Sequence, residues 1–464
     1  MKQKLFVLSM DAMVHEDVAY LMTKPNFSRI MEKRAEVEQV CSVYPTSTYP
    51  AHTSILTGCL PGKHGIRTNV PFKTIQDGYP HWYLHSRSIR VEDLFAAAKR
   101  AGCTTASVFW PITGGNPNID HNIDEYFLFF TEEDPLVTYA RLGADEVAMD
   151  AIRENLSLLP VRDPQTNRCN RTFDDFIMGC TCSLIRNVQP DVLLVHNCCL
   201  DTLRHGNGIF NEAVTAGLDQ TDAWLGQVLD AMEQAGVYEQ TNFVILSDHG
   251  QMDLQRWVSL NALLVQEGLI ELRPNGEFYD WRAFAQSNGM SATVFLTDPE
   301  DPALYRQVET FLQKLIHEKK WGFTKLYTKE ELKQKYGTYG PFSFMLATDG
   351  HTTLVENWDG AVFREKDPSD YRTGSATHGY EPELGPQPVF LAHGPAFREG
   401  AVIPRAHLID EAPTLAKILG QEMPQAQGRC LDELLRGQKG DLGNGSSETI
   451  SGSPVRIPPG EQYF

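Results

Sequence analysis

The sequence predicts an α/β fold: a large, mostly parallel central sheet with helices on both faces, and a smaller inserted α+β subdomain. The first indication is a series of short, continuous apolar runs that alternate with segments of helical periodicity. Such runs are typical of parallel strands buried on both faces by helices. The second indication is a change in the pattern of predicted secondary structure after about residue 255, where short strands mix with charged helices.

The core elements follow one another in strand–helix order along the chain. The predicted strands are Leu5–Met10, Thr104–Trp110, Asp191–His196, Asn242–Ser247 and Pro388–Ala392. The predicted helices are Ser88–Ala101, closed by Gly102, then Phe173–Val188, Glu212–Ala235 and Ile409–Leu419. We therefore expect residues 1–254 and 346–437 to form the core and 255–345 to form an inserted cap subdomain. Residues 438–464 are rich in Gly, Ser and Pro, which is typical of a loose C-terminal tail.

Composition narrows the possible partners. The chain has 41 Lys and Arg against 60 Asp and Glu, a formal charge of −19, which repels the phosphates of a nucleic-acid polymer. No stretch reaches the roughly 18 apolar residues that a membrane span needs. The first apolar run ends at Asp11, too early for a secretory signal, so a cytoplasmic location is expected. The nine cysteines include no CxxC pair and indicate no disulfide framework. Oligomeric state does not follow from the sequence.

Acidic residues and histidines follow the predicted strands. In open parallel sheets, ligands bind outside the carboxyl ends of the strands, so these side chains suggest one shared site. Each has an ordinary reading when taken alone, as a turn former, a helix cap or a surface pair. Together, three aspartates and three histidines form a ligand set suited to two divalent metal ions, and Zn²⁺ is the ion that this set suits best. These six residues are Asp11, Asp201, His205, Asp248, His249 and His378.

A hydroxyl-rich segment precedes a short predicted helix. Pro50 suits the first turn of this helix and Gly58 its end, which puts the hydroxyls of Ser47 and Thr48 at the helix N-terminus. One reading is a helix cap. The other is a nucleophile, since a helix N-terminus and a metal ion favour both an alkoxide and an incoming phosphate.

Five motifs in order resemble the nucleotide pyrophosphatase/phosphodiesterase branch of the alkaline phosphatase superfamily. They are Ser9-Met10-Asp11, Pro45-Thr46-Ser47-Thr48-Tyr49-Pro50-Ala51-His52, His64-Gly65-Ile66, Ser247-Asp248-His249-Gly250-Gln251-Met252 and Thr377-His378-Gly379-Tyr380. The segment 409–415 is also similar to the family's final helix. The sequence departs at Ala51, where relatives often carry Asn, and at Ala12, where they often carry Gly.

The resemblance implies roles for individual residues. Asp201, His205 and His378 match the ligands of one zinc, and Asp11, Asp248 and His249 match those of the second. Thr48 matches the nucleophile that bridges toward the metals, and Asn69 matches a donor to a phosphoryl oxygen. The implied protein is a two-zinc phosphodiesterase or nucleotide pyrophosphatase that acts on a small phosphate ester or nucleotide through a phosphothreonine.

Two alternatives of function stay open at this point. One is another enzyme of the superfamily, similar to phosphonoacetate hydrolases or to phosphomonoesterases. The other is a catalytically silent metal-binding module. Because Asn69 takes the place of a guanidinium, which a monoesterase would use against the extra phosphate charge, we expect a preference for diesters. Arg67 and Arg204 could supply that guanidinium instead.

Other residues near these motifs have mainly structural interpretations. His52 and His64 are expected to support the site, and Cys198 and Cys199 to pack in the core. The aromatic side chains Tyr49, Phe109 and Trp110 are usual core residues, but they are also candidate walls for a nucleobase or another apolar leaving group.

Overall fold

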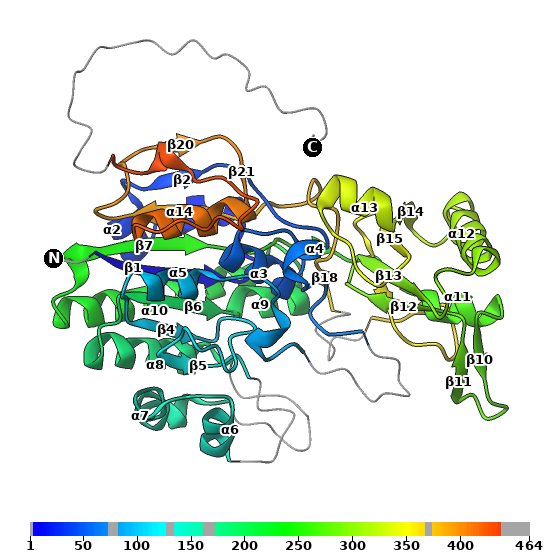
Figure 1. The fold of residues 1–464 in the computed structure, drawn as a ribbon, viewed down its shortest axis with the longest axis horizontal. Helices are drawn as coiled ribbons and strands as arrows, with labels where there is room; N and C mark the ends of the chain where they lie inside the picture. Colours follow the sequence, from blue (N-terminus) through cyan, green and yellow to red (C-terminus); the bar gives the residue numbers. More distant parts are fainter. Residues whose placement is uncertain (1–2, 73–81, 127–133, 161–171, 367–373, 438–464) are drawn as a thin grey trace, which may run out of the picture.

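Figure 1 shows the chain as a computed structural model. The structure describes residues 3–72, 82–126, 134–160, 172–366 and 374–437; the predicted tail at 438–464 lies outside them. Among the described helices, none combines the length and the apolar character that crossing a bilayer requires.

The centre of the fold is an eight-stranded sheet with the order β20-β2-β19-β7-β1-β6-β4-β5. Strands β7, β1, β6, β4 and β5 run parallel, whereas β19 pairs antiparallel with both β7 and β2. The strands are β1 (Lys4–Met10), β2 (Ala35–Val37), β4 (Thr105–Val108), β5 (His121–Ile123), β6 (Val192–Asn197), β7 (Thr241–Leu246), β19 (Phe390–His393) and β20 (Val402–Ile403). The fold class predicted from the sequence is confirmed.

Helices cover both faces of the sheet because the central strands are apolar on both sides (Figure 1). In β1, Phe6 and Leu8 join one hydrophobic core, while Leu5 and Val7 join the other. The first core includes side chains of α1 (His15–Leu21), α2 (Pro25–Met31), α7 (Glu146–Asn155), α8 (Asp174–Asn187) and α10 (Glu212–Gln234). The second includes side chains of α3 (Thr48–Thr57), α5 (Leu94–Arg100) and α14 (Glu411–Ile418).

Most predicted core elements are present, but the helix predicted over residues 88–101 is shorter than expected. It begins at Leu94, because the Asp93 carboxylate accepts a hydrogen bond from the Ala96 N–H at 2.8 Å and caps the helix there. Ser86–Ser88 forms a separate 3₁₀ turn. The strand predicted to reach Trp110 ends at Val108, and Phe109 follows it with φ of +57°.

The segment after β7 forms small sheets beside the core. An antiparallel sheet of β12 (Ala283–Ser287), β13 (Ser291–Leu296), β15 (Phe344–Thr348) and β14 (Phe323–Thr328) packs with α11 (Leu260–Gln266) and α12 (Pro302–His317). A three-stranded sheet joins β9 (Arg256–Ser259), β16 (Thr352–Val355) and β17 (Phe363–Arg364). The remaining elements are β10 (Ile270–Leu272), β11 (Phe278–Trp281) and α13 (Lys329–Tyr336). The division at residues 255 and 345 stays a prediction, although this segment has an apolar core of its own.

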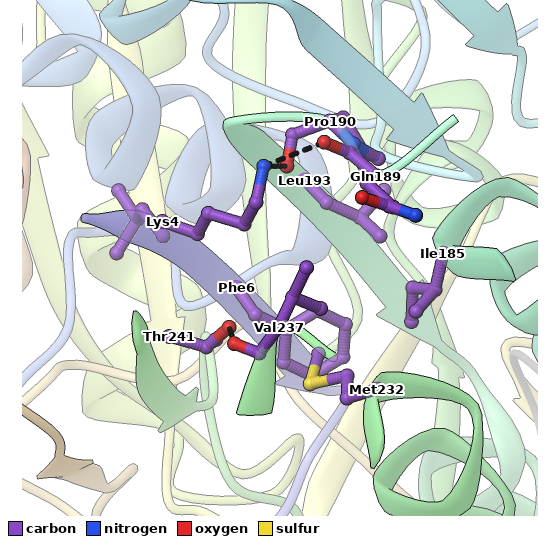
Figure 2. Close-up of a pocket in the computed structure, with 10 residues that line it drawn as sticks. Lys4, Phe6, Ile185, Gln189, Pro190, Leu193, Met232, Val237 and Thr241 are labelled. Atoms are coloured by element: carbon purple, nitrogen blue, oxygen red, sulfur yellow. Dashed lines mark hydrogen bonds between the residues drawn. The ribbon is translucent and has the colours of Figure 1, made fainter. Parts of the chain in front are cut away.

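A small cavity lies beside the first residues of β1, at the amino-terminal end of the parallel strands (Figure 2). Its volume is about 20 Å³, enough for about one water molecule. The Lys4 ammonium donates to the carbonyls of Gln189 at 2.6 Å and Pro190 at 3.3 Å. Ligands of open parallel sheets bind at the opposite, carboxyl ends of the strands, so this cavity is not the candidate site.

Candidate active site

The chemistry-bearing side chains gather where β1, β6 and β7 end. These strands run parallel in adjacent positions, with Ser9 of β1 opposite His196 of β6 and Leu246 of β7. Asp11 follows β1, and Asp248 and His249 follow β7. Asp201 lies in α9 (Cys199–Asn207), directly after β6. The strand-end rule therefore brings residues far apart in the sequence to one edge.

Asp11, Asp248 and His249 form one group, here called the first triad. The His249 Nε2 atom lies 3.2 Å from Asp248 Oδ2 and 3.7 Å from Asp11 Oδ1. The other ring nitrogen, Nδ1, lies 3.2 Å from the Gly250 carbonyl, to which it donates, so Nε2 presents its lone pair to the two carboxylates. The triad is fully inside the protein, with His249 and Asp248 at 0% exposure.

Asp201, His205 and His378 form the second triad. Asp201 and His205 are four residues apart on α9, which places His205 Nε2 3.2 Å from Asp201 Oδ1. The His205 Nδ1 atom donates to the Ala376 carbonyl at 2.8 Å, which directs Nε2 toward the carboxylate. His378 comes from the loop after β18 (Ala376–Thr377), and its ring stacks on that of His249 with centroids 4.2 Å apart. The two triads are thus direct neighbours.

The donor geometry of both triads fits divalent metal ions. With metal–ligand bonds of about 2.0–2.2 Å, tetrahedral zinc separates nitrogen and oxygen ligands by roughly 3.2–3.6 Å. The donor separations of 3.2 Å and 3.7 Å lie at or beside this range. Asp11 Oδ1 and Asp248 Oδ2 are also buried without a hydrogen-bond partner among the described residues. Buried carboxylate oxygens of this kind are costly unless a cation neutralises them.

Burial and mutual repulsion shift the ionisation of the site. Burial and the charge of Asp201 raise the pKa of Asp11 to about 7, and burial and the charge of Asp11 raise the pKa of Asp248 well above its ordinary value. Burial and the neighbouring His378 lower the pKa of His249, and burial and His205 lower the pKa of His378 to about 4. His249 and His378 are therefore neutral at pH 7 and able to act as ligands.

Metal affinity should fall as the pH drops below about 7, because a metal ion must displace the proton that the raised pKa keeps on Asp11. One displaced proton weakens binding about tenfold for each pH unit below that pKa. Competition against a chromogenic chelator between pH 5 and 8 measures this slope. An affinity that stays constant between pH 5.5 and 7 would contradict the proton competition, since the pKa values of both Asp11 and Asp248 are raised and a metal ion must displace the proton from each.

Thr48 is the first residue of α3, with Ser47 as its N-cap. Its Oγ1 atom lies 3.2 Å from His249 Nε2, so the hydroxyl faces the first triad from the helix N-terminus. Asn69 lies beside it, and its Oδ1 accepts a hydrogen bond from the Tyr49 N–H at 3.0 Å. That bond ties the Asn69 side chain to the start of the helix through its oxygen and leaves its NH₂ group as the donor end. The site therefore combines a buried hydroxyl at the N-terminus of a helix with two carboxylate–imidazole triads.

His52 and Gln251 hold these groups in place, and the sequence predicts a supporting role for only the first of them. The His52 ring lies 2.8 Å from Ser9 Oγ, and its Nδ1 lies 2.9 Å from the Thr48 carbonyl and 3.4 Å from Asp248 Oδ2. Gln251 donates to Asp201 Oδ1 at 2.5 Å, a role that its place in the Asp248 motif could have suggested.

Gly379 is required where the His378 loop meets the insert. Its φ of +91° is a conformation that side chains rarely adopt, and a Cβ atom there would lie 1.6 Å from the Asn288 carbonyl oxygen. The close approach lets Met290 N–H donate to the His378 carbonyl at 2.9 Å, and Ser291 Oγ to the Gly379 carbonyl at 2.7 Å. A turn of the insert thus holds the loop that carries a second-triad ligand.

The aromatic side chains considered as walls for a substrate lie in the protein interior. Phe109 and Trp110 have 0% exposure and Tyr49 has 1%. Phe109 packs against Phe173, and Trp110 packs edge-on against His52. The interpretation of Phe109 and Trp110 as substrate walls was wrong for this structure, because both side chains point into the two cores instead.

The two arginines considered as phosphate-binding groups are engaged elsewhere. Arg204 is 1% exposed and forms a buried ion pair with Asp17 at 2.5 Å. Arg67 donates to the Tyr339 carbonyl, and burial and the charge of Arg90 lower its pKa. Both contacts hold the guanidinium groups in the surrounding structure.

The fold and the strand-end site are those expected of a hydrolase of the alkaline phosphatase superfamily. A family profile described as type I phosphodiesterase/nucleotide pyrophosphatase matches residues 5–381, most of the chain. The chain belongs to this family.

Individual relatives are distant. Human ectonucleotide pyrophosphatase/phosphodiesterase family member 5 is 23% identical over 426 residues, which cover 90% of this chain and 74% of the human one. Rat family member 3 is 22% identical over 397 residues, which are 82% of this chain but 37% of the rat protein. The chain therefore spans well under half the length of some relatives that it matches.

The fold also matches solved structures. The structure of murine ectonucleotide pyrophosphatase/phosphodiesterase 5 superposes with a TM-score of 0.64 at 20% identity, over 94% of this chain and 100% of the murine chain. The human counterpart gives a TM-score of 0.65 at the same identity. At this level of identity, the match establishes the fold.

Proposed function

We propose that this protein hydrolyses small phosphodiesters or nucleotide pyrophosphates, with Thr48 as nucleophile. In this proposal the two triads bind two divalent metal ions, and zinc is the preferred ion. The observation that carries the proposal is the position of the Thr48 hydroxyl. It lies at a helix N-terminus, 3.2 Å from the Nε2 atom of a histidine that belongs to one triad and stacks on the other.

The proposed metals are consistent with the donor chemistry. The triads offer imidazole nitrogen and carboxylate oxygen without sulfur, and zinc binds both in sites of this kind. When bound, the ions would supply positive charge that lowers the pKa of a hydroxyl and neutralises the phosphate and the leaving group.

The chain's own residues carry the remaining chemistry. Thr48 Oγ1 releases its proton to solvent and attacks phosphorus, the bond from phosphorus to the leaving oxygen breaks with its electron pair on that oxygen, and a phosphothreonine forms. Water then cleaves that ester and restores the threonine. The positive end of the α3 dipole favours the anionic phosphoryl group, and the Asn69 NH₂ group would donate to one of its oxygens.

The proposed substrate class is a nucleotide or similar diester. A solved structure of an inactive variant of the murine relative contains AMP, which supports a nucleotide for this chain as well. The two candidate guanidiniums bind other groups, which supports Asn69, a neutral donor, as the side chain that would contact the phosphoryl group. A monoester carries one more negative charge than a diester and gains less from a neutral donor.

The diester preference predicts a ratio of rates. On one zinc-loaded preparation, kcat/KM for a nucleotide p-nitrophenyl ester should exceed that for p-nitrophenyl phosphate by about tenfold or more, the difference that about 1.4 kcal/mol produces. Phosphonoacetate on the same preparation tests the related hydrolase activity.

The control for this ratio is Thr48→Ala, which should lose turnover of both esters and so exclude a contaminating phosphatase. A monoester value equal to or above the diester value would favour a phosphomonoesterase. Two bound metal ions without turnover of any ester would favour the metal-binding module.

A further inference from the structure

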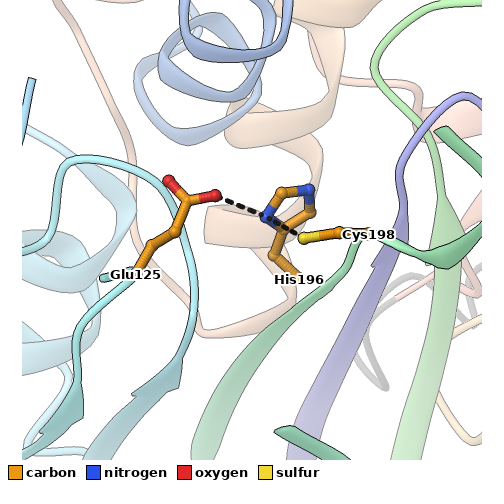
Figure 3. A group of neighbouring side chains, drawn as sticks. All are labelled: Glu125, His196 and Cys198. Carbon is orange, nitrogen blue, oxygen red and sulfur yellow. Dashed lines mark hydrogen bonds and ion pairs between the residues drawn. The ribbon is translucent and has the colours of Figure 1, made fainter. Parts of the chain in front are cut away.

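A third group of ligand-type side chains lies behind the first triad. Glu125 follows β5, His196 lies in β6, and Cys198 precedes α9 (Figure 3). The His196 Nδ1 atom lies 3.4 Å from Glu125 Oε1 and 3.8 Å from Cys198 Sγ. Glu125 and His196 are 3% and 1% exposed. The role proposed above for the two triads uses none of these three residues.

Two oxygen acceptors face one ring nitrogen of His196. Besides Glu125 Oε1, the Phe109 carbonyl oxygen lies near His196 Nδ1, at 3.2 Å. A single N–H group on Nδ1 can point well at only one of these two oxygens. The second oxygen of Glu125, Oε2, is buried with no hydrogen-bond partner among the described residues. A cation placed among these atoms would satisfy the carboxylate and the sulfur at once.

The donor separations match tetrahedral metal coordination. With bonds of about 2.0 Å to nitrogen or oxygen and 2.3 Å to sulfur, tetrahedral zinc separates nitrogen from oxygen by roughly 3.3 Å and nitrogen from sulfur by roughly 3.5 Å. The observed separations are 3.4 Å and 3.8 Å. A thiolate, an imidazole and a carboxylate together select zinc-like ions over Mg²⁺ or Ca²⁺.

We propose that Glu125, His196 and Cys198 bind a third divalent cation of the zinc class, separate from the two triads. The other ring nitrogen of His196, Nε2, lies 3.2 Å from Asp11 Oδ2. With Nδ1 bound to the cation, Nε2 carries the hydrogen and donates it to Asp11, as in carboxylate–histidine–metal arrangements. The third cation therefore holds the Asp11 carboxylate in position, and Cys198 is a ligand rather than a packing residue.

Cobalt substitution distinguishes this site from the triads, because thiolate–Co²⁺ coordination produces a near-ultraviolet charge-transfer band and the triads contain no sulfur. The protein loaded with Co²⁺ should show that band. Cys198→Ser should lose the band and one Co²⁺ per chain while it retains the cobalt bound by the triads. Cys199→Ser is the matched control, since the adjacent Cys199 is absent from the group, and it should retain both.

The proposal is overturned if the wild-type cobalt protein shows no thiolate band, or if the band persists in Cys198→Ser. X-ray absorption of the wild-type zinc protein gives a second test that needs no variant: a sulfur neighbour must be present in the zinc shell, and its absence overturns the proposal. A thiolate band together with empty triads would instead contradict the proposed two-metal hydrolase and leave the third site standing.

Discussion

Thr48→Ala should reduce turnover of a nucleotide p-nitrophenyl ester by roughly 10³-fold or more, as the loss of a covalent nucleophile does in other hydrolases. The hydroxyl contacts His249 Nε2 at 3.2 Å and donates to no carboxylate of the triads. Its removal should therefore leave the metal content and the fold unchanged. Steady-state kinetics and metal analysis by mass spectrometry on the same preparation measure both quantities.

Ser47→Ala is the matched control for this prediction. Ser47 is the neighbouring hydroxyl and the N-cap of α3, yet its side chain makes no capping hydrogen bond, so turnover should stay close to that of the wild type. Thr46 would be a poor control because its hydroxyl donates to the Tyr380 carbonyl and accepts from the Gly379 N–H, both at 3.0 Å. An inactive Ser47→Ala beside an active Thr48→Ala would transfer the nucleophile to Ser47.

Asp248→Asn should remove one metal ion and lower turnover by roughly 10³-fold, because a neutral amide is a weak ligand in a buried site. The same change should raise the melting temperature of the metal-free protein. Burial and the charge of Asp11 oppose ionisation of Asp248, and the amide removes that repulsion while it retains the hydrogen bond from the Ala12 N–H. Metal content, turnover and melting in the presence of a chelator measure the three effects.

Asp93→Asn is the control for Asp248→Asn. Asp93 is also a buried carboxylate with a raised pKa, but it caps α5, and asparagine caps helices equally well. The variant should retain metal and turnover. Full metal occupancy and normal turnover in Asp248→Asn would contradict the assignment of Asp248 as a ligand.

The sequence predicts the parallel part of the fold because burial on both faces leaves a direct signature in composition. The runs that became β1, β6 and β7 each contain at least four consecutive apolar residues, and helical segments separate them. The grouping of the six triad residues was also predictable, since parallel neighbours deliver their following residues to one edge. Their binding of metal stays a prediction.

Features that depend on contacts between distant segments were not predictable in the same way. The apolar run of β19 does not encode a direction, and the strand runs antiparallel to β7. The start of α5 depends on one capping side chain, Asp93, inside a sequence of good helical periodicity. The Glu125–His196–Cys198 group escaped notice because Glu125 follows a strand of only three residues, His121–Ile123.

The tight contact between Gly379 and the insert makes two parts of the molecule energetically dependent on each other. The 288–291 turn and the His378 loop share hydrogen bonds through Met290 N–H and Ser291 Oγ, and no side chain fits between them. Any ligand that displaces this turn must also alter the free energy of placing His378 in its triad. By thermodynamic reciprocity, occupation of that triad must change the affinity of the insert for such a ligand by the same factor. The 288–291 turn is therefore a place from which cooperativity with the second triad can arise, and a deletion that removed it would also remove the support of His378.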